Sequence, residues 1–328
     1  MNKTIITLLL SAAAISAFAQ SQRSETILKE WEFRKGHDIE TTEGWEAVSV
    51  PHDWAIYGPF DKANDLQTVA VVQNGEDVAT EKTGRTGGLP YMGKGAYRRT
   101  LDIKADELDG RRHILMFDGA MSEAQVFVNG GKVCFWPYGY NSFHCDVTEQ
   151  LKEGSNDIVV LLENREQSSR WYPGAGLYRK VRHITQPQVH VPVWGTYVTT
   201  PHIEKDHAVV SVRTKIEGVE KGSAVTLKTR ILDAGGHAVA CVTDTRLLHF
   251  GEIEQTLTVE NPTLWSPEDP VMYFVETEVY TGGSVNTDWN MDRPEISIAD
   301  GTVPCDKVST RFGFRTIEII PDKGFFLN

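Results

Sequence analysis

A short stretch near the middle of the chain holds the residues whose types and spacing best suit ligand chemistry. Residues 168–181 read S-S-R-W-Y-P-G-A-G-L-Y-R-K-V. Arg170 offers a planar fork of five N–H donors, and Trp171 and Tyr172 offer flat apolar faces beside it. The Pro-Gly-Ala-Gly segment that follows can turn tightly, because proline fixes its own φ and glycine tolerates positive φ. This combination suits the binding of a hydroxylated sugar ring, and the alternative is a structural loop around a packed aromatic side chain.

The segments on both sides of this stretch have the apolar–polar alternation of half-buried β-strands. Residues 157–162 precede it and residues 180–184 follow it. Similar short segments recur from residue 27 onward, with turn residues every ten or so positions, and Asn129 and Gly130 between two apolar runs predict a tight hairpin. Many short strands with frequent turns predict a sandwich or a jelly roll.

A second series of strand-like segments begins at Thr196. Its clearest members are residues 209–213, 224–232, 251–259 and 271–279. About seven short strands over such a length are typical of an immunoglobulin-like sandwich. Two polar segments, 56–95 and 281–305, have no clear periodicity, and we assign no function to the second.

Six short motifs occur in a fixed order along the chain. They are V-P-H-D-W at 50–54, G-A-Y-R-R at 95–99, V-F-V-N-G at 126–130, R-W-Y-P-G-A-G-L-Y-R at 170–179, L-W-S-P at 264–267 and R-F-G-F-R-T at 311–316. Their order and spacing resemble those of glycoside hydrolase family two, the group of β-galactosidases, β-glucuronidases and β-mannosidases. The fourth motif is similar to the signature loop of that family's sugar-binding domain.

The resemblance implies an all-β fold in two domains followed by the start of a third. Residues 24–187 would form a jelly-roll sugar-binding domain, and residues 188–313 an immunoglobulin-like β-sandwich. Residues 314–328 are similar to the first hairpin of the family's catalytic (β/α)8 barrel. Such a barrel needs about 250 residues, so we expect this sequence to be an N-terminal fragment. Trp171, Tyr172 and Phe314 are expected on the faces that pack against the barrel.

The family's hydrolysis resembles a retaining mechanism with two Glu carboxylates about 5 to 5.5 Å apart. Both are expected beyond Asn328, so we predict no catalytic residue, no metal site and no cofactor here, and expect the fragment to be inactive alone. The resemblance implies substrate binding instead. The predicted substrate-binding residues are Arg170, Trp171, Tyr172, Asp53 and Tyr91.

Arg170 departs from the family pattern. Well-known β-galactosidases and β-glucuronidases have a substrate-facing Asp at this place, nine positions before the Arg that corresponds to Arg179. The charge is reversed here, so that role does not carry over. A guanidinium could bind neutral sugar hydroxyls, pair with a uronate carboxylate, or brace an aromatic ring.

The first nineteen residues have the pattern of an export signal. Lys3 precedes an apolar run over residues 5–15, and Ala17-Phe18-Ala19 fits the cleavage rule. The apolar run is shorter than the roughly 20 residues that cross a bilayer. We therefore expect cleavage after Ala19 and a periplasmic or secreted protein with no membrane partner.

The net charge and the cysteine content bear on nucleic-acid binding and on the state of the thiols. A net charge of −12 and a pI near 5.3 argue against nucleic-acid binding, which needs a basic surface. Cys134 and Cys145 are the only pair close in sequence, and in an exported protein a disulfide could join them if neighbouring antiparallel strands brought them together. Free cysteines often behave as small apolar residues, so we expect all four to be unpaired buried thiols.

Three functions remain open at this point. The first is the non-catalytic part of an exported retaining exo-β-glycosidase, a β-galactosidase acting on oligosaccharides with a terminal β-linked sugar. The second is the same scaffold with β-glucuronidase or β-mannosidase specificity. The third is a stand-alone carbohydrate-binding module, which the reading frame after Asn328 would distinguish. The expected partners are the oligosaccharide and the barrel, and a homo-oligomer is left open.

Overall fold

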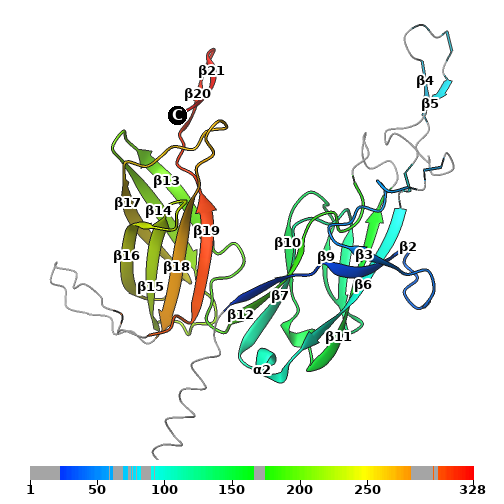
Figure 1. Ribbon diagram of the computed structural model, residues 1–328, viewed down its shortest axis with the longest axis horizontal. Coiled ribbons are helices and arrows are strands. Elements are labelled where there is room, and N and C mark those ends of the chain that lie inside the picture. The colour runs from blue at the N-terminus through cyan, green and yellow to red at the C-terminus, as the bar shows by residue number, and fades with distance from the viewer. Residues whose placement is uncertain are drawn as a thin grey trace, which may run out of the picture. The chain divides into compact units, whose positions relative to one another are not determined.

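The computed structural model describes residues 23–58, 60–61, 69–72, 75, 77–78, 80–82, 90–91, 93–165, 174–281, 298 and 302–328. These residues form two compact units, Ser24–Thr185 and Gln186–Asn328, the second joined by Arg23. Both units consist almost entirely of β-strands (Figure 1), which confirms the all-β fold. No helix within the described ranges is long and apolar enough to cross a membrane.

The first unit is a jelly-roll sandwich of two sheets. The strand order is β1-β12-β7-β10 in one sheet and β3-β2-β6-β11-β8-β9 in the other. The strands are β1 (Ser24–Ile27), β2 (Glu30–Lys35), β3 (Glu46–Ser49), β6 (Gly93–Ile103), β7 (Arg111–Phe117), β8 (Ala124–Val128), β9 (Gly131–Trp136), β10 (Phe143–Asp146), β11 (Gly154–Asn164) and β12 (Val181–Pro187). The first and last strands of the unit pair with each other, Ser24 opposite Thr185.

Short elements complete the first unit. A small separate sheet consists of β4 (Val69–Val71) and β5 (Thr80–Lys82), within the segment that has no periodicity in the sequence. One helical turn, α2 (Ala105–Leu108), precedes β7, and the 3₁₀ turn η2 (Thr148–Gln150) follows β10.

The core of the first unit follows directly from the alternation of its strands. Ile158, Val160 and Leu162 of β11 are fully buried, and the residues between them are not. The predicted hairpin is confirmed, because Asn129 (φ 50°) and Gly130 (φ 80°) connect β8 to β9. Two successive positive φ angles define the turn type whose twist matches that of the flanking strands.

A disulfide joins the two sheets of this sandwich. Cys134 of β9 and Cys145 of β10 are bonded, with Cα atoms 6.0 Å apart. The expectation of four unpaired thiols is therefore wrong for these two. β9 and β10 belong to different sheets, and the packing of the two layers brings the thiols together. Cys241, an exposed residue, and Cys305, a half-buried one, are free.

The second unit is a sandwich of seven strands within the described residues, as the immunoglobulin-like interpretation predicts. One sheet has the order β13-β14-β17 and the other β16-β15-β18-β19. The strands are β13 (Thr196–Ile203), β14 (His207–Lys215), β15 (Ala224–Leu232), β16 (Ala238–Leu247), β17 (Glu252–Glu260), β18 (Tyr273–Thr281) and β19 (Asp306–Phe312). Every second residue of β17 is buried, so this strand turns one complete face to the core.

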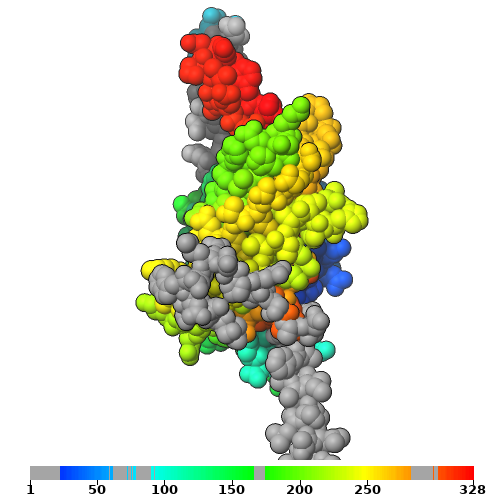
Figure 2. Space-filling view, turned by 90° about the vertical axis from the view of Figure 1, so that its left-hand side faces the viewer, coloured from blue at the N-terminus to red at the C-terminus, as the bar shows by residue number. Residues whose placement is uncertain are grey.

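The end of the chain forms the hairpin β20 (Ile317–Ile320) and β21 (Gly324–Leu327). Figure 2 shows it, in red, projecting from the second unit. Ile319 is 76% exposed and Phe325 is 63% exposed. Phe314, in contrast, is fully buried and packs edge-on against Tyr273 at 4.8 Å, so its predicted place on an open face is wrong. Trp171 and Tyr172, predicted for the same face, lie outside the described residues.

Two histidines stack inside the first unit. The rings of His113 and His183 lie 5.1 Å apart at an interplanar angle of 11°. His113 Nε2 is 2.8 Å from the Glu107 carbonyl oxygen, so Nε2 carries the proton. His113 Nδ1 therefore accepts the 2.9 Å hydrogen bond that His183 Nε2 donates. Burial, with the neighbouring His113 adding to it, lowers the pKa of His183 to about 4, and burial also lowers the pKa of His113.

We expect this pair to make the first unit less stable below pH 6.5. The unfolded His183 has a pKa near 6.5, whereas the folded one has a pKa of about 4. Between these values the unfolded state binds more protons, so stability is complete above pH 6.5 and is lost as the pH falls. The loss from His183 is at most about 1.4 kcal/mol per pH unit.

Urea denaturation at pH 7, 6 and 5 measures this slope above the range where most carboxylates titrate. His183→Gln should flatten it, whereas His237→Gln, at an exposed position, should leave it unchanged. A His183→Gln protein with the wild-type slope would show that the pair does not set this pH dependence.

The disulfide leads to a second prediction. Removing it in Cys134→Ala/Cys145→Ala frees a short loop, with a sequence separation of 11. The chain-entropy relation then gives a loss of about 3 kcal/mol in the free energy of unfolding of the first unit. Reduced and oxidised wild-type protein should differ by a similar amount in urea denaturation. Cys241→Ala is the control, with a change within about 0.5 kcal/mol. Equal stability of reduced and oxidised protein would contradict this prediction.

Candidate functional site

The segment that contains the Arg-Trp-Tyr motif starts and ends at one edge of the jelly roll. Asn164 Nδ2 donates a hydrogen bond of 2.6 Å to the carbonyl oxygen of Gly174, which ties the end of β11 to the residue where the described chain resumes. Arg170, Trp171 and Tyr172 lie outside the described residues, so their role stays a prediction. The anchoring of both ends is nevertheless visible.

Asp53 lies in a tight turn beside the returning end of that segment. Its Oδ1 accepts a hydrogen bond from the backbone N–H of Ala55 at 3.0 Å. A Cβ atom placed on Gly174 would lie 3.5 Å from Asp53 Oδ2. The backbone N–H of His52 donates to the carbonyl oxygen of Leu177 at 2.8 Å. The structure therefore brings Asp53, which is half-buried, to the same edge as the predicted sugar-binding segment.

Tyr91 is connected to this turn by a hydrogen bond with Trp54. Trp54 is buried and stacks on Phe33 with ring centroids 5.3 Å apart, and its indole N–H donates to the Tyr91 carbonyl oxygen at 3.1 Å. The Tyr91 hydroxyl donates to the Lys94 carbonyl oxygen at 2.9 Å, and partial burial raises the pKa of this phenol. The Tyr91 hydroxyl is thus engaged within the protein, although the residue lies next to the Asp53 turn.

His52 and Tyr97 belong to the site but were missing from the sequence prediction. The Tyr97 hydroxyl lies 2.8 Å from His52 Nδ1. Burial raises the pKa of Tyr97 far above its ordinary value and lowers the pKa of His52, so a neutral phenol donates to a neutral imidazole. Both residues lie in quoted motifs, yet they are 45 positions apart, and no sequence pattern signals their pairing.

Gly176 passes directly over this pair. A Cβ atom on it would lie 2.3 Å from Tyr97 Oη and 2.6 Å from the His52 carbonyl oxygen, and its φ is +93°. Gly176 and Met121 also exchange two backbone hydrogen bonds, of 2.9 and 3.1 Å. Ser122, the residue after Met121, donates a hydrogen bond from its Oγ to the carbonyl oxygen of Glu163 at 2.8 Å. Only glycine fits at position 176, and the segment is held there from two sides.

This edge offers the groups that a hydroxylated ring requires. The half-buried Asp53 carboxylate can accept hydrogen bonds from hydroxyls. Tyr57, 75% exposed, lies nearly parallel to the His52 ring, with centroids 6.3 Å apart, and presents an open aromatic face. These groups can bind and orient a sugar.

Two further acidic residues of the first unit have structural partners. Asp118 pairs with Arg182, and Glu123 pairs with Arg165. Within the described ranges, no cluster of three or more His, Cys, Asp and Glu side chains could hold a metal ion.

Two segments of the chain match descriptions of one protein family. Residues 16–187 match the sugar binding domain of glycosyl hydrolases family 2. Residues 189–292 match a further domain described as glycosyl hydrolases family 2.

Individual relatives agree with these matches. A β-galactosidase of Bacteroides ovatus is 31% identical over 332 residues, which cover 97% of this chain and 34% of the relative. A β-glucuronidase of Bacteroides fragilis is 26% identical, over 99% of this chain and 42% of the relative. A solved glycosyl hydrolase family 2 structure from Bacteroides cellulosilyticus superposes with a TM-score of 0.73 and 28% identity, over 93% of this chain and 37% of that one.

The chain thus spans between a third and about two fifths of the length of these relatives. The sugar-binding match alone covers more than half of the chain, residues 16–187 of 328. The chain belongs to glycosyl hydrolases family 2.

Proposed function

We propose that this chain is the non-catalytic, sugar-binding part of a retaining exo-β-glycosidase with β-galactosidase specificity. The observation that carries the proposal is the anchoring of the signature segment at the Asp53 turn. Gly174 lies beside the Asp53 carboxylate, and Gly176 is packed on the His52–Tyr97 pair. Gly174 and Gly176 are thereby fixed to a rigid edge, and a rigid support is what a site that orients a ligand needs.

In this proposal different residues supply hydrogen-bond acceptors, hydrogen-bond donors and apolar surfaces for the sugar. Asp53 accepts hydrogen bonds from sugar hydroxyls, and Arg170 donates them through its planar fork. Trp171 and Tyr172 supply apolar faces for the ring. Tyr91 supports the Asp53 turn through the hydrogen bond that its carbonyl oxygen accepts from Trp54. The carboxylates that cleave the glycosidic bond belong to a catalytic barrel, in which two Glu residues act as acid/base and nucleophile.

A β-glucuronidase is the second candidate, because relatives of both specificities match the chain over nearly its whole length. The two substrates differ in charge, since a glucuronide carries a carboxylate that a galactoside lacks. Arg170 suits either substrate. A guanidinium can donate to neutral hydroxyls or pair with a carboxylate through two parallel hydrogen bonds.

We also propose that the protein is exported to the periplasm or secreted, with cleavage after Ala19. The bond between Cys134 and Cys145 supports this placement. Disulfides persist in oxidising compartments and are rare in the reducing cytosol.

The isolated chain is expected to bind sugar without hydrolysing glycosides. Purified protein would be incubated with chromogenic β-galactoside, β-glucuronide and β-mannoside. No turnover above the blank is expected for any of them, because the proposal places both catalytic carboxylates elsewhere. Turnover that a point substitution within residues 23–328 abolishes would contradict this assignment.

Arg170→Ala is expected to lower kcat/KM at least tenfold in the enzyme that contains both this chain and its barrel. The substitution removes charge-assisted hydrogen bonds worth roughly 1.5 to 3 kcal/mol each. Arg170→Lys should not restore activity, because an ammonium group cannot reproduce the planar fork. A loss confined to the glucuronide would favour the second specificity.

Arg165→Ala is the matched control, since Arg165 is at the described end of the same segment and pairs on the surface with Glu123. It should leave kcat/KM within about twofold, as expected for a surface ion pair. Melting temperatures measured in parallel separate binding from packing. If Arg170→Ala lowers only the melting temperature, Arg170 braces an aromatic ring and does not bind sugar.

A further inference from the structure

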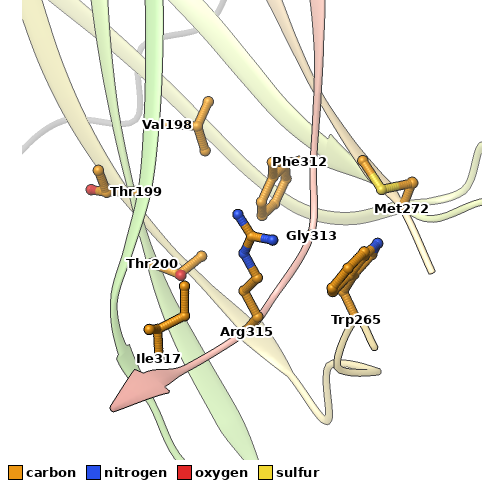
Figure 3. Close-up of a pocket in the computed structure, with 9 residues that line it drawn as sticks. All are labelled: Val198, Thr199, Thr200, Trp265, Met272, Phe312, Gly313, Arg315 and Ile317. Carbon is orange, nitrogen blue, oxygen red and sulfur yellow. The ribbon is translucent and has the colours of Figure 1, made fainter. Parts of the chain in front are cut away.

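The second unit contains a pocket that shares no residue with the candidate sugar site. Its volume is about 500 Å³, and it lies between the edge strand β13 and the chain that leaves β19. Figure 3 shows Arg315 in the middle of this pocket, with its guanidinium directed toward Phe312. Trp265 and Met272 lie on one side of Arg315, and Thr199 and Thr200 lie on the other.

The guanidinium of Arg315 lies against an aromatic ring, and no carboxylate among the described residues pairs with it. It lies 5.2 Å from the centroid of the Trp265 ring. Elsewhere in the same unit, Arg230 pairs with Glu276 and Arg246 pairs with Asp244. For Arg315, the described part of the chain provides neither an ion pair nor a hydrogen bond. Its five N–H donors are therefore available to a ligand within the pocket.

The wall that carries Arg315 is fixed by close packing. A Cβ atom on Gly313 would lie 2.9 Å from Trp265 Cβ, so the chain passes directly against the indole. The backbone N–H of Trp265 donates to the Phe314 carbonyl oxygen at 2.7 Å. Asn328 Nδ2 donates to the Trp265 carbonyl oxygen at 3.0 Å. The cation is thus attached to a rigid wall, which lowers the entropic cost of binding.

The opposite wall contains two consecutive threonines because β13 is irregular. The register with β14 shifts between Thr199 and His202, as in a β-bulge. Side chains of consecutive strand residues normally point to opposite faces, yet Thr199 and Thr200 both line the pocket. A bulge re-aims side chains in this way. Two threonines therefore contribute to the wall opposite Trp265 and Met272, and the lining also includes the apolar side chain of Phe312.

We propose that this pocket binds an acidic sugar, a pyranose that carries a carboxylate. The Arg315 fork pairs with the carboxylate through two parallel hydrogen bonds. The Thr200 side chain bonds to a ring hydroxyl, and the apolar face of the ring packs on Phe312 and Met272. The site is separate from hydrolysis and holds an acidic glycan on the immunoglobulin-like unit. Arg315 is the charged residue among those that line the pocket, so it supplies the local attraction for such an anion against the repulsion from an overall charge of −12.

Calorimetric titration of the protein with sodium glucuronate tests the proposal, with glucose and acetate as reference ligands. Glucuronate should bind saturably, with a dissociation constant on the order of 1 mM for so open a site. Glucose lacks the carboxylate and acetate lacks the ring, so each should bind about tenfold more weakly or worse. Acetate binding as tightly as glucuronate would indicate a site for any carboxylate, such as an acidic peptide side chain, and would overturn the proposal.

Substitutions inside and outside the pocket test whether glucuronate binds there. Arg315→Gln should weaken glucuronate binding by about tenfold or more. Arg311→Gln removes the same charge from β19 outside the pocket and should change affinity by no more than about twofold. Thr200→Val keeps the shape of the wall and should weaken binding several-fold, a test that does not depend on the folding of the Arg315 variant. Unchanged binding in both Arg315→Gln and Thr200→Val, with wild-type melting temperatures, would refute the site.

Arg170→Ala separates this site from the candidate sugar site of the first unit. Glucuronate binding that survives Arg170→Ala and disappears in Arg315→Gln belongs to the pocket of the second unit. The opposite pattern would assign the binding to the first unit and overturn this inference, while leaving the proposed function intact.

Discussion

The close approach of the backbone at Gly176 is the constraint on which the sugar-binding edge depends. Any side chain at this position would overlap Tyr97 and His52. Because glycine has none, the backbone can lie directly on the buried aromatic core of the jelly roll. An isolated β-bridge to Met121 and the Asn164–Gly174 hydrogen bond hold it from other directions. A binding segment tethered in this way loses less conformational entropy when a ligand arrives than a free loop would.

The second unit also contains a glycine at which the backbone packs directly against an aromatic side chain. Gly313 lets the chain pass against Trp265 as Gly176 lets it pass over Tyr97. In each case a glycine makes room for an aromatic side chain, and residues near it in sequence carry the polar groups proposed to meet a ligand. Rigid aromatic packing and positioned donors are therefore features of both units. Both proposed ligand sites therefore adjoin a glycine that lies against an aromatic side chain.

Local structure could be predicted well from the sequence because it depends on neighbouring residues. Strand β15 covers the predicted residues 224–232, and the Asn129–Gly130 hairpin forms where its turn residues require it. Contacts between distant segments could not be predicted, because alternation does not tell which strands face each other. The burial of Phe314 and the His52–Tyr97 pair are of this kind. The Cys134–Cys145 bond joins residues close in sequence, but it depends on how the two sheets pack. Arg315 lay within a quoted motif, but its place in a pocket depends on a bulge in a strand far from it in sequence.

The pairing of β1 with β12 has a consequence for how the first unit folds. Ser24 lies opposite Thr185 and Ile27 opposite Arg182, so residues from the two ends of the unit must meet before the four-stranded sheet is complete. Contacts this distant in sequence require the closure of nearly the whole unit as one loop, which makes folding slow compared with that of proteins built from local contacts. While the chain emerges from the ribosome, β7 has no β12 beside it, and the apolar face of the sandwich stays uncovered. The timing of the last strand therefore governs how long the nascent protein needs protection from aggregation.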